Sequence, residues 1–81
     1  MTTTNILPKT VLKHGVYYAG RCRNAEVARW NADTQQFYHW RTKFGLRFVE
    51  TIRHREDDDH FDVFDAEAEL ANPTEEIPFR E

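Results

Sequence analysis

The chain has 81 residues, of which 40% are hydrophobic and 31% are charged, and its formal net charge is −3. This length allows a single domain with a modest core, and the hydrophobic content excludes a disordered chain. No apolar run reaches transmembrane length, and residues 1–10 lack the apolar core of a signal peptide. The single cysteine, Cys22, excludes an internal disulfide, so we expect a cytoplasmic protein that does not bind membranes.

The N-terminal third predicts short β-elements after a loose start. Residues 1–10 are rich in threonine and predict a flexible leader, followed at 10–13 by a short strand or an entry segment. The β-forming residues at 16–20 predict the first strand, and the break at 20–24 predicts an irregular loop or bulge. The second strand is expected at 25–31.

The middle of the chain predicts an alternating sheet. A turn follows the second strand, and the third strand is expected at 36–42. The Lys43-Phe44-Gly45 sequence turns the chain into a fourth and longest strand at 46–54, where apolar and polar residues alternate.

The remainder predicts a fifth strand at 61–64, one or two helical turns at 66–71, and a flexible acidic tail at 73–81. Residues 11–72 then form the single β-rich domain. We expect a mainly β fold of four or five strands, either a strongly bent antiparallel sheet or a small, partly open barrel. At most one short helix is expected, near the C-terminus.

The period-two pattern also predicts the core of this sheet. The expected core residues are Trp30, Trp40, Phe48, Ile52, Phe61 and Val63.

The sequence contains no pattern typical of a catalytic or metal site. His54 and His60 flank the acidic residues 56–59, but their spacing matches neither a zinc nor an EF-hand signature. Cys22 has no base at a spacing that indicates a nucleophilic dyad. There is no serine and no glycine-rich phosphate loop. We therefore expect a protein that is not an enzyme and that needs no metal or cofactor.

Charge is divided unevenly along the chain, and both charged regions are candidate binding surfaces. Residues 1–55 contain ten Lys or Arg and three Asp or Glu, whereas residues 56–81 contain one Arg and eleven Asp or Glu. The basic part is interleaved with aromatic residues, which stack on bases while cations hold phosphates in nucleic-acid-binding sheets. The candidate basic–aromatic face comprises Tyr38, Arg41, Lys43, Arg47 and Arg53.

We interpret the acidic run as a contact surface for a basic partner, because complementary charge selects partners and speeds association. Two other interpretations stay open: the run is a solvated loop, or it neutralises the chain's own Arg41, Arg47 and Arg53. The candidate acidic contact residues are Glu56, Asp57, Asp58, Asp59, Asp62 and Asp65.

Four stretches of the sequence resemble small proteins of proteobacteria and of their phages and prophages. They are the residues of 15–25 (Gly-Val-Tyr-Tyr-Ala-Gly-Arg-Cys-Arg-Asn-Ala), 28–30 (Ala-Arg-Trp), 41–45 (Arg-Thr-Lys-Phe-Gly) and 60–64 (His-Phe-Asp-Val-Phe). Small acidic proteins from such contexts include anti-CRISPR inhibitors, which bind a host nuclease or surveillance complex without performing chemistry. The resemblance carries over no functional residue.

Size, charge and this resemblance together predict a small binding protein that occupies a surface of a host protein or ribonucleoprotein complex, such as a bacterial defence complex of the CRISPR type. A phage-encoded protein of this kind acts in the cytoplasm of the host cell. The alternative is a nucleic-acid-binding module or accessory regulator that uses the basic–aromatic face.

Overall fold

The computed structural model describes residues 6–22, 25–57 and 63–79. The described residues form a short 3-10 helix and five strands, so the predicted mainly β fold is confirmed. The elements are η1 Lys9–Val11, β1 Tyr17–Arg21, β2 Val27–Asn31, β3 Gln36–Lys43, β4 Leu46–His54 and β5 Val63–Glu69.

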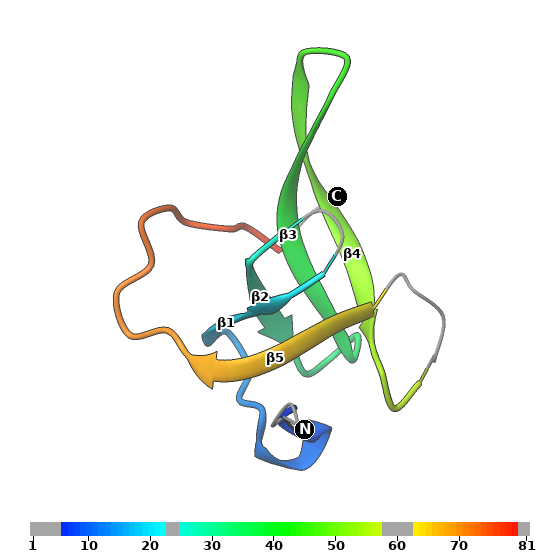
Figure 1. Ribbon diagram of the computed structural model, residues 1–81, viewed down its shortest axis with the longest axis vertical. Coiled ribbons are helices and arrows are strands. Elements are labelled where there is room, and N and C mark those ends of the chain that lie inside the picture. The colour runs from blue at the N-terminus through cyan, green and yellow to red at the C-terminus, as the bar shows by residue number, and fades with distance from the viewer. Residues whose placement is uncertain (1–5, 23–24, 58–62, 80–81) are drawn as a thin grey trace, which may run out of the picture.

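The five strands follow one another around a closed ring (Figure 1). β1 to β4 form an antiparallel meander, and β5 returns to lie antiparallel to β1. β4 and β5 run parallel and pair at Arg53–Val63 and His54–Phe64. The ring is uneven, because β3 and β4 pair along their whole length and extend as a hairpin well beyond the other strands (Figure 1).

Aromatic rings fill the interior of the ring. Trp30, Phe37 and Phe64 are fully buried, with ring centroids 4.8 Å apart for Trp30–Phe37 and 4.9 Å apart for Phe37–Phe64. Such offset and edge contacts are the favoured arrangements of aromatic pairs. Ala28 and Ala66 are also fully buried, and their small side chains leave room for these rings.

The predicted core is confirmed for Trp30, Ile52 and Val63, which are all buried. The prediction for Phe48 is wrong, because this side chain is 38% exposed on the part of β4 that extends beyond the ring. Trp40 is half-buried and packs on the outside of the ring, so it is not an interior residue.

The helix predicted at 66–71 is wrong, because β5 extends to Glu69. Alanine and glutamate favour a helix locally, but here Ala66 and Ala68 pair with β1, and Ala66 lies in the core. The 3-10 helix lies instead at the N-terminal side, where the sequence predicts a strand or an entry segment. Phe61, the predicted start of the fifth strand, lies outside the described residues.

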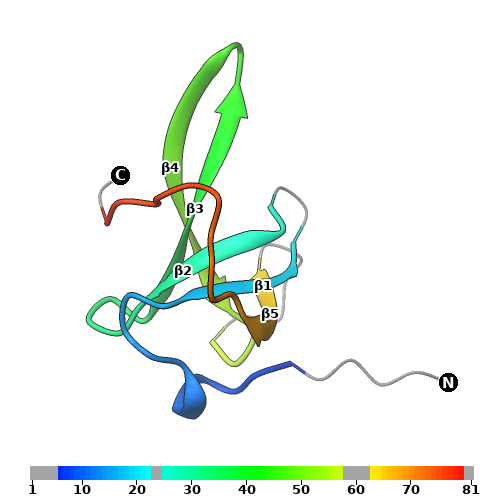
Figure 2. The same ribbon diagram turned by 90° about the vertical axis from the view of Figure 1, so that its left-hand side faces the viewer.

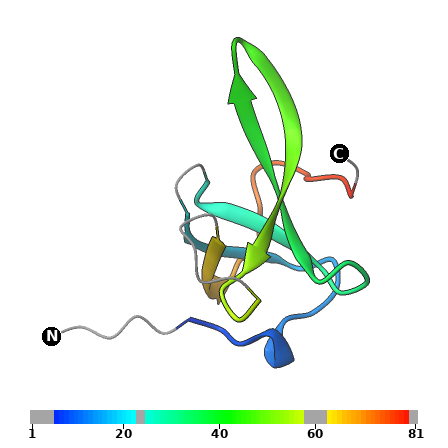
Figure 3. The ribbon, with the colours of Figure 1, turned by 90° about the vertical axis from the view of Figure 1, so that its right-hand side faces the viewer.

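The N-terminal segment is attached to the end of the ring opposite the hairpin tip (Figure 3). The backbone N–H of Leu7 donates to the carbonyl of Ala66 at 2.8 Å. The buried His54 donates from Nε2 to the carbonyl of Leu7 at 2.8 Å, and its Nδ1 accepts the backbone N–H of Glu56 at 2.9 Å. The domain boundaries predicted near residues 10 and 73 stay predictions, although both flanking segments contact the ring within the described residues.

The ring closes where β5 passes very near β1. The pairing of these strands shifts register between Ala19 and Gly20, as in a β-bulge. An added Cβ at Gly20 would lie 2.2 Å from the carbonyl oxygen of Asp65 and 2.9 Å from the Cα of Ala66. Both are backbone atoms of β5, so a side chain at position 20 requires the two strands to separate.

We therefore expect Gly20→Ala to lower the free energy of unfolding by on the order of 2–3 kcal/mol, as overpacking of a backbone contact does. Gly45→Ala is the matched control: Gly45 has φ 76° but nothing within 4 Å of an added Cβ. Its cost is therefore only the left-handed backbone, about 1 kcal/mol. Urea denaturation measures both variants, and an equal or smaller loss for Gly20→Ala would contradict this account of ring closure.

Candidate functional site

The β3–β4 hairpin has a tight, well-defined tip. The strands pair from Gln36–Arg53 at the base to Lys43–Leu46 at the tip, which leaves Phe44 and Gly45 as a two-residue loop. Both loop residues have positive φ, 54° for Phe44 and 76° for Gly45. This is the pattern of a type I′ turn, whose twist matches that of the strands it joins. The hairpin thus projects from the ring as a continuous ribbon.

Phe44 is an unusual residue for the tip. The first position of such a turn favours Asn, Asp or Gly, because other side chains are strained at positive φ. The Phe44 side chain is also 91% exposed, so the chain gains almost no burial from it. Strained backbone that brings no packing of its own is typical of functional positions.

Two further exposed apolar side chains lie on one face of the ribbon behind Phe44. Leu46 is 70% exposed and Phe48 is 38% exposed. Cross-strand partners share a face, so Lys43 lies beside Leu46 and Arg41 lies beside Phe48. We call Lys43, Phe44, Leu46 and Phe48 the tip patch. Its face continues the inner face of the ring into solvent, which leaves these side chains without an opposing layer.

The base of this face is closed by polar groups. Arg41 donates from Nη1 to both carboxylate oxygens of Glu50, at 3.0 and 3.1 Å. His39 is fully buried beside them, and its Nε2 lies 3.3 Å from Glu50 Oε1, at an angle that makes no hydrogen bond. Its Nδ1 lies 3.1 Å from the carbonyl oxygen of Trp40 and donates to it, since a carbonyl only accepts. The Glu50 carboxylate thus separates the aromatic interior from the tip patch.

The residues of the predicted basic–aromatic face do not form one surface. Arg41 and Lys43 lie on the tip-patch side of the ribbon, whereas Arg47 and Arg53 pair opposite Thr42 and Gln36 on the other side. Arg53 is exposed.

Two members of this face are already engaged inside the chain. Arg47 bonds Glu75, and its guanidinium lies 4.4 Å from the centroid of the Trp40 ring. Tyr38 is buried, with its ring centroid 5.1 Å from that of Phe79. The Tyr38 ring is therefore not available to another molecule, whereas Arg47 is exposed but already paired with Glu75.

The acidic segment begins at the end of the ring opposite the tip (Figure 1). Lys9 contacts both of its first carboxylates: its backbone N–H donates to Glu56 at 3.0 Å, and its Nζ donates to the two oxygens of Asp57 at 2.8 and 2.9 Å. Asp65 accepts two hydrogen bonds from Arg55, at 2.8 and 2.9 Å. The candidates Asp58, Asp59 and Asp62 lie outside the described residues.

Two described carboxylates of the acidic run, Asp57 and Asp65, thus pair with Lys9 and Arg55, not with the Arg41, Arg47 and Arg53 of the neutralisation interpretation, and Glu56 accepts a backbone N–H. A role of these acids in partner binding stays a prediction. Across residues 6–22, 25–57 and 63–79, no three His, Cys, Asp or Glu side chains gather as a metal ion would require. No helix in that part of the chain is long and apolar enough to cross a membrane.

The tip patch is the candidate site that sequence reasoning missed. The period-two pattern predicts that Phe48 lies on the inner face of the sheet. Phe48 is exposed even so, because the ring ends before this position, and periodicity does not reveal where a sheet ends. The one local signal was Phe44 in a Lys-Phe-Gly turn, at a position that favours asparagine. Comparison of the chain with protein-family models, curated proteins and solved structures finds no match.

The turn geometry generates a test that needs no partner. We expect Phe44→Asn to raise the free energy of unfolding by roughly 1 kcal/mol, since asparagine tolerates the left-handed conformation and little burial is lost. Chemical denaturation of the two proteins measures the difference. A loss of stability would mean that Phe44 contributes to the fold, and the functional interpretation of its exposure would fail.

Proposed function

We propose that the protein is a non-enzymatic binding protein that inserts its tip patch into an apolar pocket of another protein. The observation that carries the proposal is Phe44, a large aromatic side chain held at positive φ and 91% exposed at the end of a projecting hairpin. Aromatic residues that enter a pocket at the centre of an interface supply much of its binding energy. A hairpin fixed in advance also loses little conformational entropy when it binds.

The chemistry of the patch favours a protein pocket with an acidic rim. Phe44, Leu46 and Phe48 supply the apolar surface, and Lys43 stands beside them at the tip. Among the described residues, no carboxylate pairs with Lys43, whose Nζ lies 5.7 Å from the centroid of the Phe44 ring. A carboxylate on the partner would therefore be able to pair with the Lys43 ammonium group, next to the apolar side chains of the tip patch.

A nucleic-acid partner is the second candidate, favoured by the placement of Arg41, Lys43, Arg47 and Arg53 on the same hairpin. A two-stranded ribbon fits the major groove of DNA, and its cations would contact phosphates. Arg41 and Arg47, however, are already paired with Glu50 and Glu75 inside the chain. Binding of phosphate would have to break these pairs, so we place this candidate second.

The biological setting of the proposal comes from the resemblance to small phage and proteobacterial proteins. In that setting the partner is a host complex, such as a nuclease or surveillance complex of a bacterial defence system, met in the cytoplasm. The acidic segment at the opposite end of the ring is proposed as a second contact, for a basic surface of the same partner.

The main test is a pull-down from bacterial lysate, with and without nuclease, using the wild-type protein, Phe44→Asn and Val11→Asn. Val11 is the matched control, since it is 50% exposed on η1, far from the tip. We expect a nuclease-resistant partner protein that the wild type and Val11→Asn retain and Phe44→Asn loses. Equal capture by all three proteins would contradict docking through the tip. Capture that disappears with nuclease, together with salt-sensitive oligonucleotide binding, would support the second candidate.

The acidic segment has a separate test. We expect the triple change of Asp57, Asp58 and Asp59 to Asn to leave the melting temperature within a few degrees, because an exposed pair such as Lys9–Asp57 contributes only about 0–1 kcal/mol. Association with the captured partner should become slower and less sensitive to salt. A large fall in melting temperature with unchanged association kinetics would show that the acids serve the fold alone.

A further inference from the structure

The C-terminal segment lies across the outside of the ring, over β2 and β3 (Figure 2). We call residues 73–79 the strap. Side chains of three strands hold its backbone. Trp40 Nε1 donates to the carbonyl of Glu76 at 3.0 Å, the N–H of Ile77 donates to the hydroxyl of Tyr17 at 2.8 Å, and Arg29 Nη1 donates to the carbonyl of Ile77 at 2.8 Å. These bonds reach backbone atoms, so other sequences in an extended conformation would satisfy them equally well.

Alternate side chains of the strap contact the ring. Glu75 bonds Arg47, which lowers the pKa of the Glu75 carboxyl below its ordinary value and keeps it ionised. Ile77 is only 3% exposed, in a cluster with Tyr38 and Val49.

Phe79 makes the third side-chain contact. Its ring centroid lies 4.2 Å from the guanidinium carbon of Arg29 and 5.1 Å from the Tyr38 ring centroid. The outer face thus binds an acid, an aliphatic residue and an aromatic residue at every second position of the strap, Glu75, Ile77 and Phe79.

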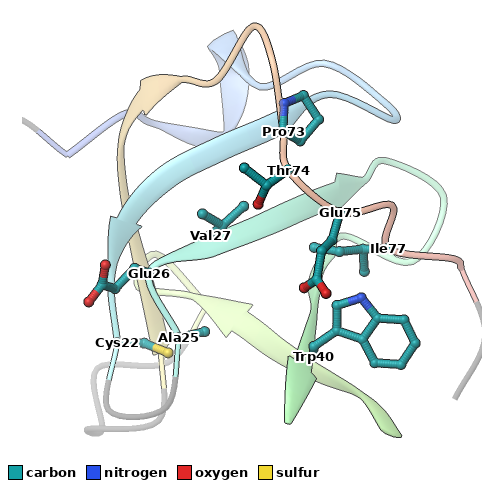
Figure 4. Close-up of a pocket in the computed structure, with 9 residues that line it drawn as sticks. All are labelled: Cys22, Ala25, Glu26, Val27, Trp40, Pro73, Thr74, Glu75 and Ile77. Carbon is teal, nitrogen blue, oxygen red and sulfur yellow. The ribbon is translucent and has the colours of Figure 1, made fainter. Parts of the chain in front are cut away.

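The strap does not fill the face that it covers. A groove of about 480 Å³ lies next to the strap segment Pro73–Glu75, and Val27, Trp40 and Cys22 form part of its wall (Figure 4). This groove is partly open to solvent, so a side chain can enter it without displacing the ring. Thr74 also lines the groove, so a larger apolar side chain at its place has room to extend over Val27. A segment with a larger apolar side chain at the position of Thr74 would therefore fill this groove better than the strap does.

We infer that the outer face of β1, β2 and β3 is a second binding surface, for a segment of a partner protein that follows the path of the strap and whose place the strap occupies. The partner segment carries a bulky apolar residue followed by an acid, an aliphatic residue and an aromatic residue at the positions of Thr74, Glu75, Ile77 and Phe79. This inference is independent of the tip patch, which lies on the other side of the ribbon.

Attachment to the same chain explains why this surface would be closed in the free protein. A short linker gives the strap an effective concentration on the order of millimolar at its own site. A partner segment at micromolar concentration must therefore bind much more tightly than the strap, or meet a protein whose strap has been released. The wild-type protein is then expected to bind strap-like peptides weakly.

The test uses the full-length protein with Ile77→Asp, which removes the buried anchor of the strap, and Val11→Asp as a control that leaves the strap in place. The probe is a fluorescent peptide with the sequence of residues 72–79. We expect Ile77→Asp to bind this peptide at least about tenfold more tightly than the wild type and Val11→Asp do, because the competing strap has been weakened. A peptide carrying Thr74→Phe should bind more tightly still, and adding Arg47→Gln to the protein should weaken binding several-fold.

If Ile77→Asp does not fold by itself, the peptide should restore its cooperative thermal transition, and a scrambled peptide should not. Three results would overturn the inference: no binding by a folded Ile77→Asp protein, equal binding of the scrambled peptide, or no restoration of an unfolded one. Salt-sensitive binding of a single-stranded oligonucleotide by Ile77→Asp, in place of the peptide, would also overturn it and would assign the uncovered aromatic and basic groups to nucleic acid.

Discussion

The near contact between β5 and Gly20 is the constraint on which the other features of the protein depend. β5 closes the ring mainly through β1, since its described pairing with β4 is confined to Arg53–Val63 and His54–Phe64. Closure gives each strand two neighbours within the ring, and it encloses Trp30, Phe37 and Phe64 in a small chain with little other means of stabilising itself. The absent side chain at position 20 allows the two backbones to approach.

Two surfaces of different character follow from this uneven ring. The β3–β4 hairpin is longer than the strands that could cover it. The distal part of its inner face is therefore exposed and forms the tip patch. The outer face of the hairpin carries Tyr38, Trp40 and Arg47. The strap covers Tyr38 and bonds the side chains of Trp40 and Arg47, which stay partly exposed. The protein therefore exposes apolar groups at the tip, while the strap covers part of the aromatic surface on the opposite face of the hairpin.

At the hairpin tip, the residue that is present disagrees with the sequence preference of the turn. Along most of the ribbon, turn chemistry, alternation and pairing agree, as in a chain that folds to one structure. Phe44 departs from the turn preference and gains no burial in return. The buried His54 behaves differently: both of its ring nitrogens have backbone partners, which attach the N-terminal segment to the turn after β4. The polar groups of His54 are thus satisfied by the fold, whereas the fold gives no such explanation for Phe44 at the tip.

The sequence by itself determined the features that depend on neighbouring residues. Alternation and turn residues predicted the β class, the span of β4 at 46–54 and the turn at Phe44–Gly45 before any long-range contact was known. Tertiary structure alone decided the rest, because it depends on segments distant in sequence. Ala66–Glu69 joined a strand only because β1 offered a partner, and Phe48 stayed exposed because no element lies opposite the distal ribbon. Ile77 was buried through contact with residues some forty to sixty positions earlier, which no local pattern records.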